Sequence, residues 1–300
     1  MLTPFVFAIL AATLCEVSTA AGDLRVSILP LPPLLIDGQP ARAHTQGLEI
    51  VSNVFYVTAR REDTQPKRSL LLRTDSQRSD WDVWDITPLT ADGALTSLDH
   101  PGGFQSDGRS LWIPLAESRR HGRSIIRRFP FSSITPGQPL AAETEFSVED
   151  HIGALAVSTE SKTLLGASWD TERVYLWDYS GKRLRTFSRP ELSARDLGVS
   201  PSSNQPRGLT VQDWKFVQGQ LFASGLFRDP AAEPSTPQSR LARFTGFAEP
   251  SFQSKVTSLP KQFGTELSRE GLAISGGHAW FLPEDLGPSN RVFRASLPEL

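Results

Sequence analysis

The chain has 300 residues, of which 39% are hydrophobic and 21% are charged, and its formal net charge is -2. This composition is that of an ordinary globular protein with enough chain for a large core. The near-neutral charge and the lack of a basic run exclude the simplest basis for binding nucleic acid or an anionic membrane surface.

The first twenty residues differ from the rest of the chain. The stretch PFVFAILAATLC is apolar but too short to cross a bilayer, and small residues follow it. We therefore expect residues 1–20 to be a cleaved secretory signal and the mature protein to be secreted or periplasmic. Cys15 is the only cysteine, so cleavage would leave neither a disulfide nor a thiol.

A short phrase recurs five times along the rest of the chain. It reads HTQGLEI from residue 44, HPGGFQS from 100, HIGALAV from 151, QPRGLTV from 205 and SREGLAI from 268. Each phrase precedes a turn and a short apolar run, which is the pattern of antiparallel strands. Repeats of about 55 residues are typical of propeller blades. We therefore predict five blades that begin near these five positions.

A third run follows in every unit and opens with an arginine: Arg68, Arg123, Arg173, Arg240 and Arg291. Fourth strands are visible in the first four units as WDVWDI, TEFSV, RLRTF and KVTSL, but the chain stops soon after the third run of the fifth. The alternating stretch LRVSIL at residues 24–29 can supply the missing strand. We therefore predict an all-β fold, one five-bladed β-propeller over residues 21–300, closed by an N-terminal strand.

Three of the five histidines, His44, His100 and His151, stand at the same place in the phrase. The inner strands of a propeller line its channel, so we expect these side chains at the channel mouth. Three neutral imidazoles with a position left open for water are a familiar set for catalytic zinc. One divalent metal, zinc or calcium, is therefore a candidate cofactor. Structural hydrogen bonds and direct ligand contact are the alternatives.

The corresponding polar positions of the other units extend this candidate site. Gln205 and Ser268 occupy the histidine position in the last two units, and Gln46, Arg207 and Glu270 directly precede the small residue of the phrase. We expect Gln46, Gln205 and Ser268 to bind a ligand. Glu270 is the candidate general acid or base, and Arg207 is the candidate catalytic partner beside it.

The five arginines suggest a basic rim that gathers an anionic ligand. Nearby acids such as Glu117 and Glu284 favour the alternative, in which each arginine pairs with an acid. Trp169, just before the third strand of its unit, is the candidate for stacking on a ligand. Trp112 and Trp280 occupy matching second-strand positions and are expected in the core between blades.

The first unit, HTQGLEIVSNVFYVTARREDTQPKRSLLLRTD, resembles the opening repeat of the glutamine cyclotransferases, secreted five-bladed propellers with an FTQGL phrase. EGLAISGGHAWFLPED is similar to an EGL repeat of that family. The family's acidic EST group is replaced here by Val57, Thr58 and Ala59, so the resemblance implies the fold and not the cyclase activity. The GL repeats also look like those of gluconolactonase and strictosidine synthase-like propellers, which have six blades and a divalent metal at the mouth.

The sequence thus predicts an exported propeller of an uncharacterised family that binds a small anionic or polyhydroxylated ligand, with metal-dependent hydrolysis as a candidate activity. A non-catalytic ligand-binding or protein-interaction propeller and a glutamine cyclotransferase-like acyltransferase are the alternatives. A concave polar mouth favours an enzyme, whereas a mouth filled by satisfied side chains favours a scaffold. We expect a small-molecule ligand, no nucleic acid partner and no membrane span, and the oligomeric state stays open.

Overall fold

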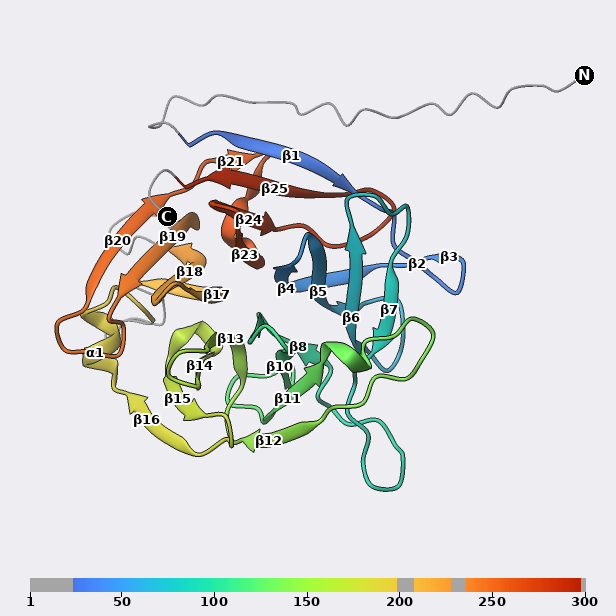
Figure 1. The fold of residues 1–300 in the computed structure, drawn as a ribbon, viewed down its shortest axis with the longest axis horizontal. Helices are drawn as coiled ribbons and strands as arrows, with labels where there is room; N and C mark the ends of the chain where they lie inside the picture. The colour runs from blue at the N-terminus through green and yellow to red at the C-terminus, as the bar shows by residue number, and fades with distance from the viewer. Residues whose placement is uncertain (1–23, 199–207, 228–235, 298–300) are drawn as a thin grey trace, which may run out of the picture.

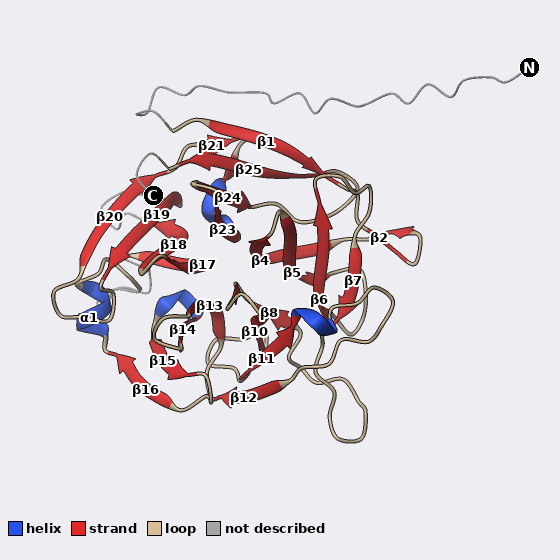
Figure 2. Cartoon of the chain, in the orientation of Figure 1, coloured by secondary structure: helices blue, strands red, loops and turns tan. Residues whose placement is uncertain are grey.

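Five antiparallel sheets stand around a central axis in the computed structural model, which describes residues 24–198, 208–227 and 236–297 (Figure 1). Strands make up nearly all of the regular structure, and the helices are short (Figure 2). The predicted all-β, five-bladed propeller is confirmed. The predicted signal, residues 1–20, lies outside the described residues.

Each blade begins with its inner strand and ends at the rim. Blade 1 consists of β4 (Ala43–Val51), β5 (Val54–Arg61), β6 (Arg68–Asp75) and β7 (Asp82–Asp85). Blade 2 consists of β8 (His100–Pro101), β9 (Gln105–Ser106), β10 (Ser110–Ala116), β11 (Ser124–Pro130) and β12 (Thr144–Val148). Blade 3 consists of β13 (Ile152–Ser158), β14 (Thr163–Ser168), β15 (Val174–Asp178) and β16 (Arg183–Phe187).

The last two blades follow the same order. Blade 4 consists of β17 (Leu209–Val217), β18 (Gln220–Phe227), β19 (Gln238–Thr245) and β20 (Gln253–Ser258). Blade 5 consists of β23 (Gly271–Ser275), β24 (His278–Leu282), β25 (Asn290–Ser296) and β1 (Val26–Leu31). Two small hairpins and four short helices lie in the connections: β2 (Leu35–Ile36) with β3 (Gln39–Pro40), β21 (Lys261–Gln262) with β22 (Thr265–Glu266), α1 (Arg189–Ser193), η1 (Phe131–Ser133), η2 (Trp169–Thr171) and η3 (Leu267–Arg269).

The N-terminal strand closes the ring as predicted. β1 pairs antiparallel with β25, from Val26 opposite Ala295 to Leu31 opposite Asn290, and the two lie side by side at the rim (Figure 1). Val26 is buried between blades 4 and 5, and Leu31 is buried between blades 5 and 1. The first described strand therefore completes the last blade and contributes to both of its interfaces.

The hydrophobic core consists of five clusters, one between each pair of neighbouring blades. Successive side chains of a strand point to opposite faces, so one strand can serve two clusters. In β6, Leu70 and Leu72 face blade 5 while Leu71 faces blade 2. This arrangement explains why the inner strands are apolar throughout and do not alternate with polar residues: both faces of each blade are buried near the channel.

The small residue in the recurring phrase is explained by close approach of the inner strands. A Cβ atom on Gly103 would lie 2.5 Å from Oδ1 of Asp213, and one on Gly271 would lie 2.8 Å from Cβ of Leu48. Gly103 also pairs with Ala154 of the next blade, donating to Gly153 and accepting from Leu155 across 2.9 Å in each case. Only small residues allow inner strands to meet this closely.

A buried ion pair closes the channel below the mouth. Lys215 Nζ lies 2.5 Å from Oδ1 of Asp213 and donates to the carbonyl of Phe104 across 2.6 Å. The other oxygen of Asp213 accepts from the backbone N–H groups of Leu48, at 3.2 Å, and Leu272, at 2.9 Å. One side-chain pair thus ties blade 4 to blades 1, 2 and 5.

Candidate functional site

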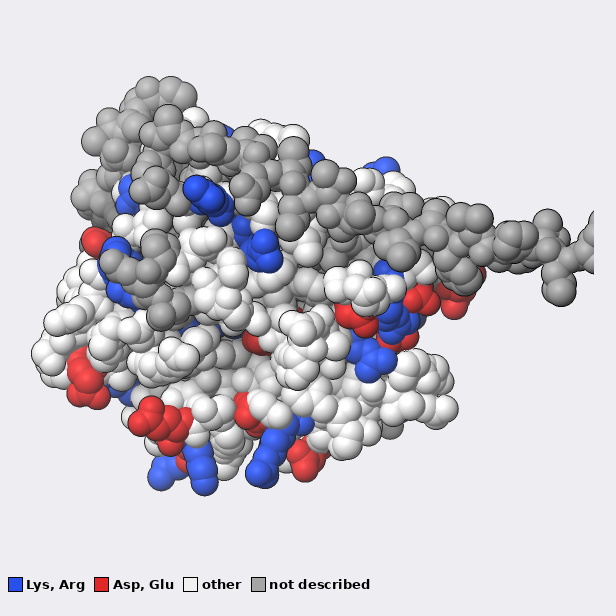
Figure 3. All heavy atoms as spheres, turned by 45° about the horizontal axis from the view of Figure 1, so that its top comes forward, with Lys and Arg blue, Asp and Glu red and all other residues white. Residues whose placement is uncertain are grey.

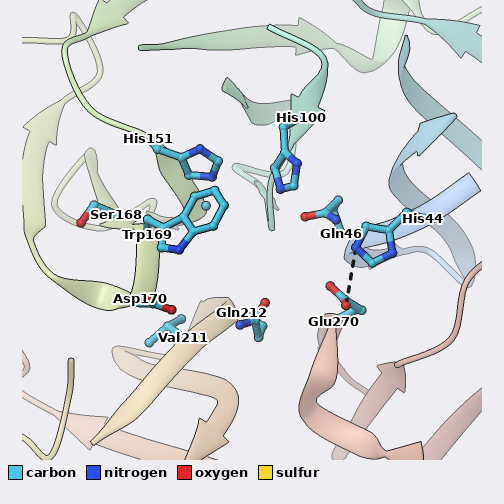
Figure 4. A pocket seen from close by; sticks show the side chains of 11 residues that line it. His44, Gln46, His100, His151, Ser168, Trp169, Asp170, Val211, Gln212 and Glu270 are labelled. Carbon is cyan, nitrogen blue, oxygen red and sulfur yellow. Dashed lines mark ion pairs between the residues drawn. The ribbon is translucent and has the colours of Figure 1, made fainter. Parts of the chain in front are cut away.

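A polar cavity of about 230 Å³ opens at the channel mouth (Figure 4). Its lining comes from the inner strands or strand entrances of all five blades and from the η2 turn of blade 3: His44, Gln46, His100, His151, Gly153, Ser168, Trp169, Asp170, Val211, Gln212 and Glu270. The cavity is smaller than most ligand sites, which have volumes of about 300–1,000 Å³.

Glu270 lies at the wall of this cavity and is nearly buried, with 7% of its surface exposed. Within the described residues no group donates a hydrogen bond to its carboxyl; the nearest charged groups are His44 Nε2 at 3.8 Å and Arg269 Nε at 3.6 Å. Burial raises its pKa to about 8, although His44 and Arg269 oppose the shift. Glu270 is therefore largely a neutral acid at pH 7.

His44 is held by a carboxylate on its other side. Its Nδ1 lies 2.6 Å from Oδ1 of Asp285, which follows β24 in the same blade as Glu270. This hydrogen bond is the largest cause of a raised His44 pKa, and burial opposes it. The same contact lowers the pKa of Asp285. Asp285, His44 and Glu270 therefore form a chain of three ionisable groups that leads from the rim into the cavity, with a dashed line marking its inner contact in Figure 4.

His100 is held by Arg60 of blade 1. The Arg60 Nη1 group lies 3.2 Å from Nδ1 of His100 and 2.8 Å from the hydroxyl of Ser118. Burial, followed by the neighbouring charges of His151 and Arg60, lowers the His100 pKa well below its usual value. His100 is therefore neutral at pH 7.

His151 is buried and its Nδ1 lies 2.7 Å from the carbonyl of Glu117. Burial lowers its pKa, and the Glu117 carbonyl opposes that shift. The ring packs edge to face on Trp169, with centroids 4.7 Å apart, and its centroid is 5.1 Å from that of His100. His151, His100 and Trp169 thus form one side of the cavity, and His44 and Glu270 form the other (Figure 4).

Two amides complete the lining. Gln46 and Gln212 each sit at a β-bulge of an inner strand, between Thr45 and Gly47 in β4 and between Val211 and Asp213 in β17. A bulge re-aims a side chain, and here it turns both amides into the cavity. Neither amide has a hydrogen-bond partner in the part of the chain that the structure describes, so both are available to a ligand.

Most of the predicted site residues meet in this cavity: His44, His100, His151, Gln46, Trp169 and Glu270. Ser268 does not line it, because its hydroxyl is buried behind the wall and donates to the carbonyl of Gly225 across 2.5 Å while accepting from the backbone of Arg240. Gln205 and Arg207 lie outside the described residues.

The alignment of the fourth repeat was wrong by five residues. It matched Gly208 to Gly47, whereas the bulge register matches Asp213 to Gly47 and Gln212 to Gln46. Gln212 was missed for that reason; the polar pair Gln212–Asp213 inside an apolar strand was the available signal. No motif or spacing in the sequence ties Asp285 to His44.

The predicted pairing of the repeat arginines with acids is confirmed for four of them: Arg68 with Asp85, Arg123 with Glu117, Arg173 with Asp150, and Arg291 with Glu284. Arg240 lies over the ring of Phe227, 3.4 Å from its centroid. On the face shown in Figure 3, acidic and basic side chains are interspersed. These four arginines are therefore held by carboxylates rather than directed at a ligand.

The three histidines are not arranged as a metal site. Among the described residues, no group of three or more His, Cys, Asp or Glu side chains could hold a metal ion. His100 supplies a physical reason: a guanidinium only donates, so the Nδ1 that faces Arg60 is an acceptor and Nε2 carries the proton. That nitrogen has no lone pair to give a metal in the cavity. The residues present thus do not fit the zinc or calcium that the sequence suggested.

Membership of a protein family is shown by sequence comparison. Residues 34–232 match DUF6454, which is described as a family of unknown function. The chain belongs to the DUF6454 family. No curated protein is significantly similar in sequence to this DUF6454 chain.

Solved structures show what the DUF6454 fold is similar to. A GH43 glycoside hydrolase engineered for endo-xylanase and exo-arabinofuranosidase activity aligns with a TM-score of 0.54 at 12% identity, over 89% of this chain and 51% of that one. A GH130 structure from work on mannoside phosphorylases and hydrolases of Candida mannan aligns with a TM-score of 0.54 at 7% identity, over 98% and 97%. A bifunctional GH43-CE protein of Bacteroides eggerthii gives 0.49 at 13% identity, over 84% and 32%. The chain thus spans about half of the engineered GH43 structure, about a third of the GH43-CE protein and nearly all of the GH130 structure, and the likeness concerns the fold alone.

In the described part of the DUF6454 chain, none of the helices has the length and apolar character needed to cross a membrane.

Proposed function

We propose that the mouth cavity binds a small polyhydroxylated or anionic ligand and hydrolyses a C–O bond in it, with Glu270 as general acid and base. The observation that carries this proposal is the Glu270 carboxyl: it is nearly buried, faces the cavity, has no hydrogen-bond donor among the described residues, and has its pKa raised to about 8. A carboxyl kept neutral near pH 7 in a cleft is suited to proton donation.

The remaining lining residues support binding. The amides of Gln46 and Gln212 offer donors and acceptors, and Trp169 offers an aromatic edge beside them. These groups hold a ligand of a few polar atoms against Glu270. Because the Asp213–Lys215 pair closes the channel below, the ligand enters and leaves by the mouth.

The reaction follows from these positions. Glu270 donates its proton to the leaving oxygen as the C–O bond breaks. The carboxylate left behind is stabilised by His44, whose Nε2 lies 3.8 Å away and whose hydrogen bond to Asp285 favours the protonated ring. Water then attacks the carbon and returns a proton to Glu270. The products from a glycoside are two hydroxyl compounds. In an ester or lactone, water adds to the carbonyl carbon first and the proton of Glu270 then goes to the leaving oxygen, while the proton lost by the added water returns to Glu270; the products are an acid and an alcohol.

A substrate panel tests this function. The shared fold with GH43 and GH130 structures places nitrophenyl glycosides in the panel, together with lactones and sugar esters. Wild-type protein should hydrolyse at least one class, with a rate that falls as the pH rises through about 8 because Glu270 loses its proton. Glu270→Gln should reduce the rate by at least about a hundredfold.

The matched control is Glu145→Gln, since Glu145 lies on the outer strand β12 and pairs with Arg127. It should hydrolyse the substrate at the wild-type rate. A Glu270→Gln variant with the wild-type rate would remove Glu270 from the mechanism.

A non-catalytic ligand-binding propeller is the second candidate. It is favoured by the amides of Gln46 and Gln212, which have no partner among the described residues and supply recognition without chemistry. Ligand binding without turnover in wild-type protein would decide for it.

We also propose export to a secreted or periplasmic location, on the apolar stretch within residues 1–20. N-terminal sequencing of protein from the native compartment should find a first residue near Ala21 or Gly22. Protein with an intact Met1 in the cytoplasm would contradict export.

A further inference from the structure

The side of the cavity formed by His100 and His151 points to the kind of chemical group that the site recognises. We propose that these two histidines, fixed in opposite tautomers, bind one hydroxyl group of an uncharged ligand, His100 donating to its oxygen and His151 accepting its proton. This inference rests on the proposed function for the location of the site, and it selects the polyhydroxylated class over the anionic class.

The tautomer of His100 is set by Arg60. The guanidinium can only donate, so Nδ1 of His100 accepts across 3.2 Å and the ring proton is at Nε2. Arg60 is itself fixed, since its Nε donates to Glu62 across 2.6 Å and its Nη1 donates to Ser118 across 2.8 Å. His100 therefore offers an N–H donor on its free side.

The tautomer of His151 is set in the opposite sense. The Glu117 carbonyl can only accept, so Nδ1 of His151 carries the proton and Nε2 keeps its lone pair. The side chain is 3% exposed and the ring also packs on Trp169, so rotation of the ring is restricted. The Arg60 contact of His100 and the Glu117 contact of His151 are both made at Nδ1.

One donor and one acceptor side by side match a hydroxyl, which accepts and donates at the same oxygen. The ring centroids are 5.1 Å apart, so both rings can reach one group. A carboxylate or phosphate oxygen only accepts, and it would meet the lone pair of His151. Burial keeps both rings uncharged near neutral pH, as their lowered pKa values indicate, so neither offers a positive charge to an anion.

Nitrogen-15 NMR of the histidine side chains tests the tautomers without any ligand. The chain has five histidines, and the signals of these two are assigned by their loss in His100→Gln and His151→Gln. At pH 7 we expect the proton at Nε2 in His100 and at Nδ1 in His151. Finding the same tautomer in both rings would overturn the proposal.

Arg60→Met should release His100 into a mixture of tautomers. The control is Arg61→Met, because Arg61 is the next residue and pairs with Asp63, at 2.7 Å, rather than with a histidine. That variant should leave the His100 spectrum unchanged. An unchanged His100 tautomer in Arg60→Met would show that Arg60 does not set it.

Ligand class is tested by titration calorimetry with neutral pentoses and hexoses, the corresponding uronates, and sugar phosphates. We expect a neutral sugar to bind more tightly than its uronate. The His151→Ala substitution should lower the affinity for the neutral sugar about tenfold. His151→Gln, whose amide oxygen can accept, should restore most of the affinity.

Tighter binding of uronates or phosphates, or of no member of the panel, would overturn the proposal. Its failure is distinct from that of the proposed function. Binding of a neutral sugar without hydrolysis would support the role of the two histidines and contradict catalysis by Glu270. Hydrolysis of an anionic substrate would support catalysis and contradict the role proposed for the histidines.

Discussion

Burial, more than pairing, controls the acids near the channel axis. Glu270 has its pKa raised to about 8, Glu49 to about 7 and Asp213 to about 6, and desolvation is the largest cause in all three. In Asp213, Lys215 and three backbone N–H groups bind the carboxylate and oppose the rise in pKa. Glu270, whose carboxyl has no such donor in the described part of the chain, is the acid at the cavity.

Glu49 gives a stability test of the same effect. A carboxyl with a raised pKa holds its proton more tightly in the folded chain than in the unfolded chain. The protonated Glu49 side chain therefore stabilises the fold below pH 4.5, and this stabilisation is lost as the pH rises toward 7. Glu49→Gln should therefore gain stability relative to wild type between pH 5 and pH 8, by up to about 3 kcal/mol. Urea unfolding at the two pH values measures the change.

Glu145→Gln, a change at an exposed paired acid, should show no such difference between the two pH values. An equal offset for Glu49→Gln at pH 5 and pH 8 would mean that Glu49 is already ionised in the folded protein at the lower pH.

Asp285 should control the charge of His44. Its hydrogen bond is the main cause of the raised His44 pKa, so Asp285→Asn should lower that pKa, as read from proton NMR shifts during a pH titration. Asp63→Asn, which removes a partner of Arg61 instead, serves as the control and should leave His44 unchanged. An unchanged His44 pKa in Asp285→Asn would show that Asp285 does not control the charge of His44.

Among the strands, the recurring phrase predicted which residues of the site come together. The fourth repeat shows why Gln212 was not among the residues predicted. Propeller geometry brings inner-strand positions to one mouth, so a correct alignment is enough to group His44, His100, His151 and Glu270. The alignment relied on a small residue, and blade 4 has Asp213 there because that side chain fills the channel. The spacing of residues in the sequence predicts neither the Asp213–Lys215 ion pair nor the hydrogen bonds that fix the histidine tautomers.

The close approach of the inner strands can be tested with one methyl group. Gly103→Ala would place a Cβ atom 2.5 Å from the Asp213 carboxylate, so it should destabilise the fold by about 1–3 kcal/mol. Gly287→Ala is the control, because nothing lies within 4 Å of its Cβ position and its φ is not positive. Its effect should stay within about 0.5 kcal/mol in thermal or urea unfolding. Equal effects of the two changes would contradict the close contact.

In the whole molecule, pairing of the N-terminal strand β1 with β25 holds the ring of blades closed. The period of the repeat and the missing fourth strand of the last unit were enough to predict five blades and the role of residues 24–29. Since every blade packs on two neighbours, opening the ring at β1 exposes the core on both sides of blade 5.

A charge in the closing strand tests this dependence. Val26→Asp places a carboxylate in the cluster between blades 4 and 5, where Val26 is 3% exposed, and should destabilise the protein by at least about 3 kcal/mol. Leu35→Asp, at a residue 45% exposed in the β2–β3 hairpin, should change stability little. Unfolding midpoints in urea provide the comparison, and a stable Val26→Asp variant would show that β1 is dispensable.

The central claim is that the mouth cavity contains a carboxyl that stays protonated at neutral pH. The infrared carbonyl band of a protonated acid reports this directly, and the difference between wild type and Glu270→Gln isolates Glu270 from Glu49 and Asp213. We expect a band that is present at pH 7 and disappears with a midpoint near pH 8. A midpoint near 4.5, the ordinary value for glutamate, would contradict it.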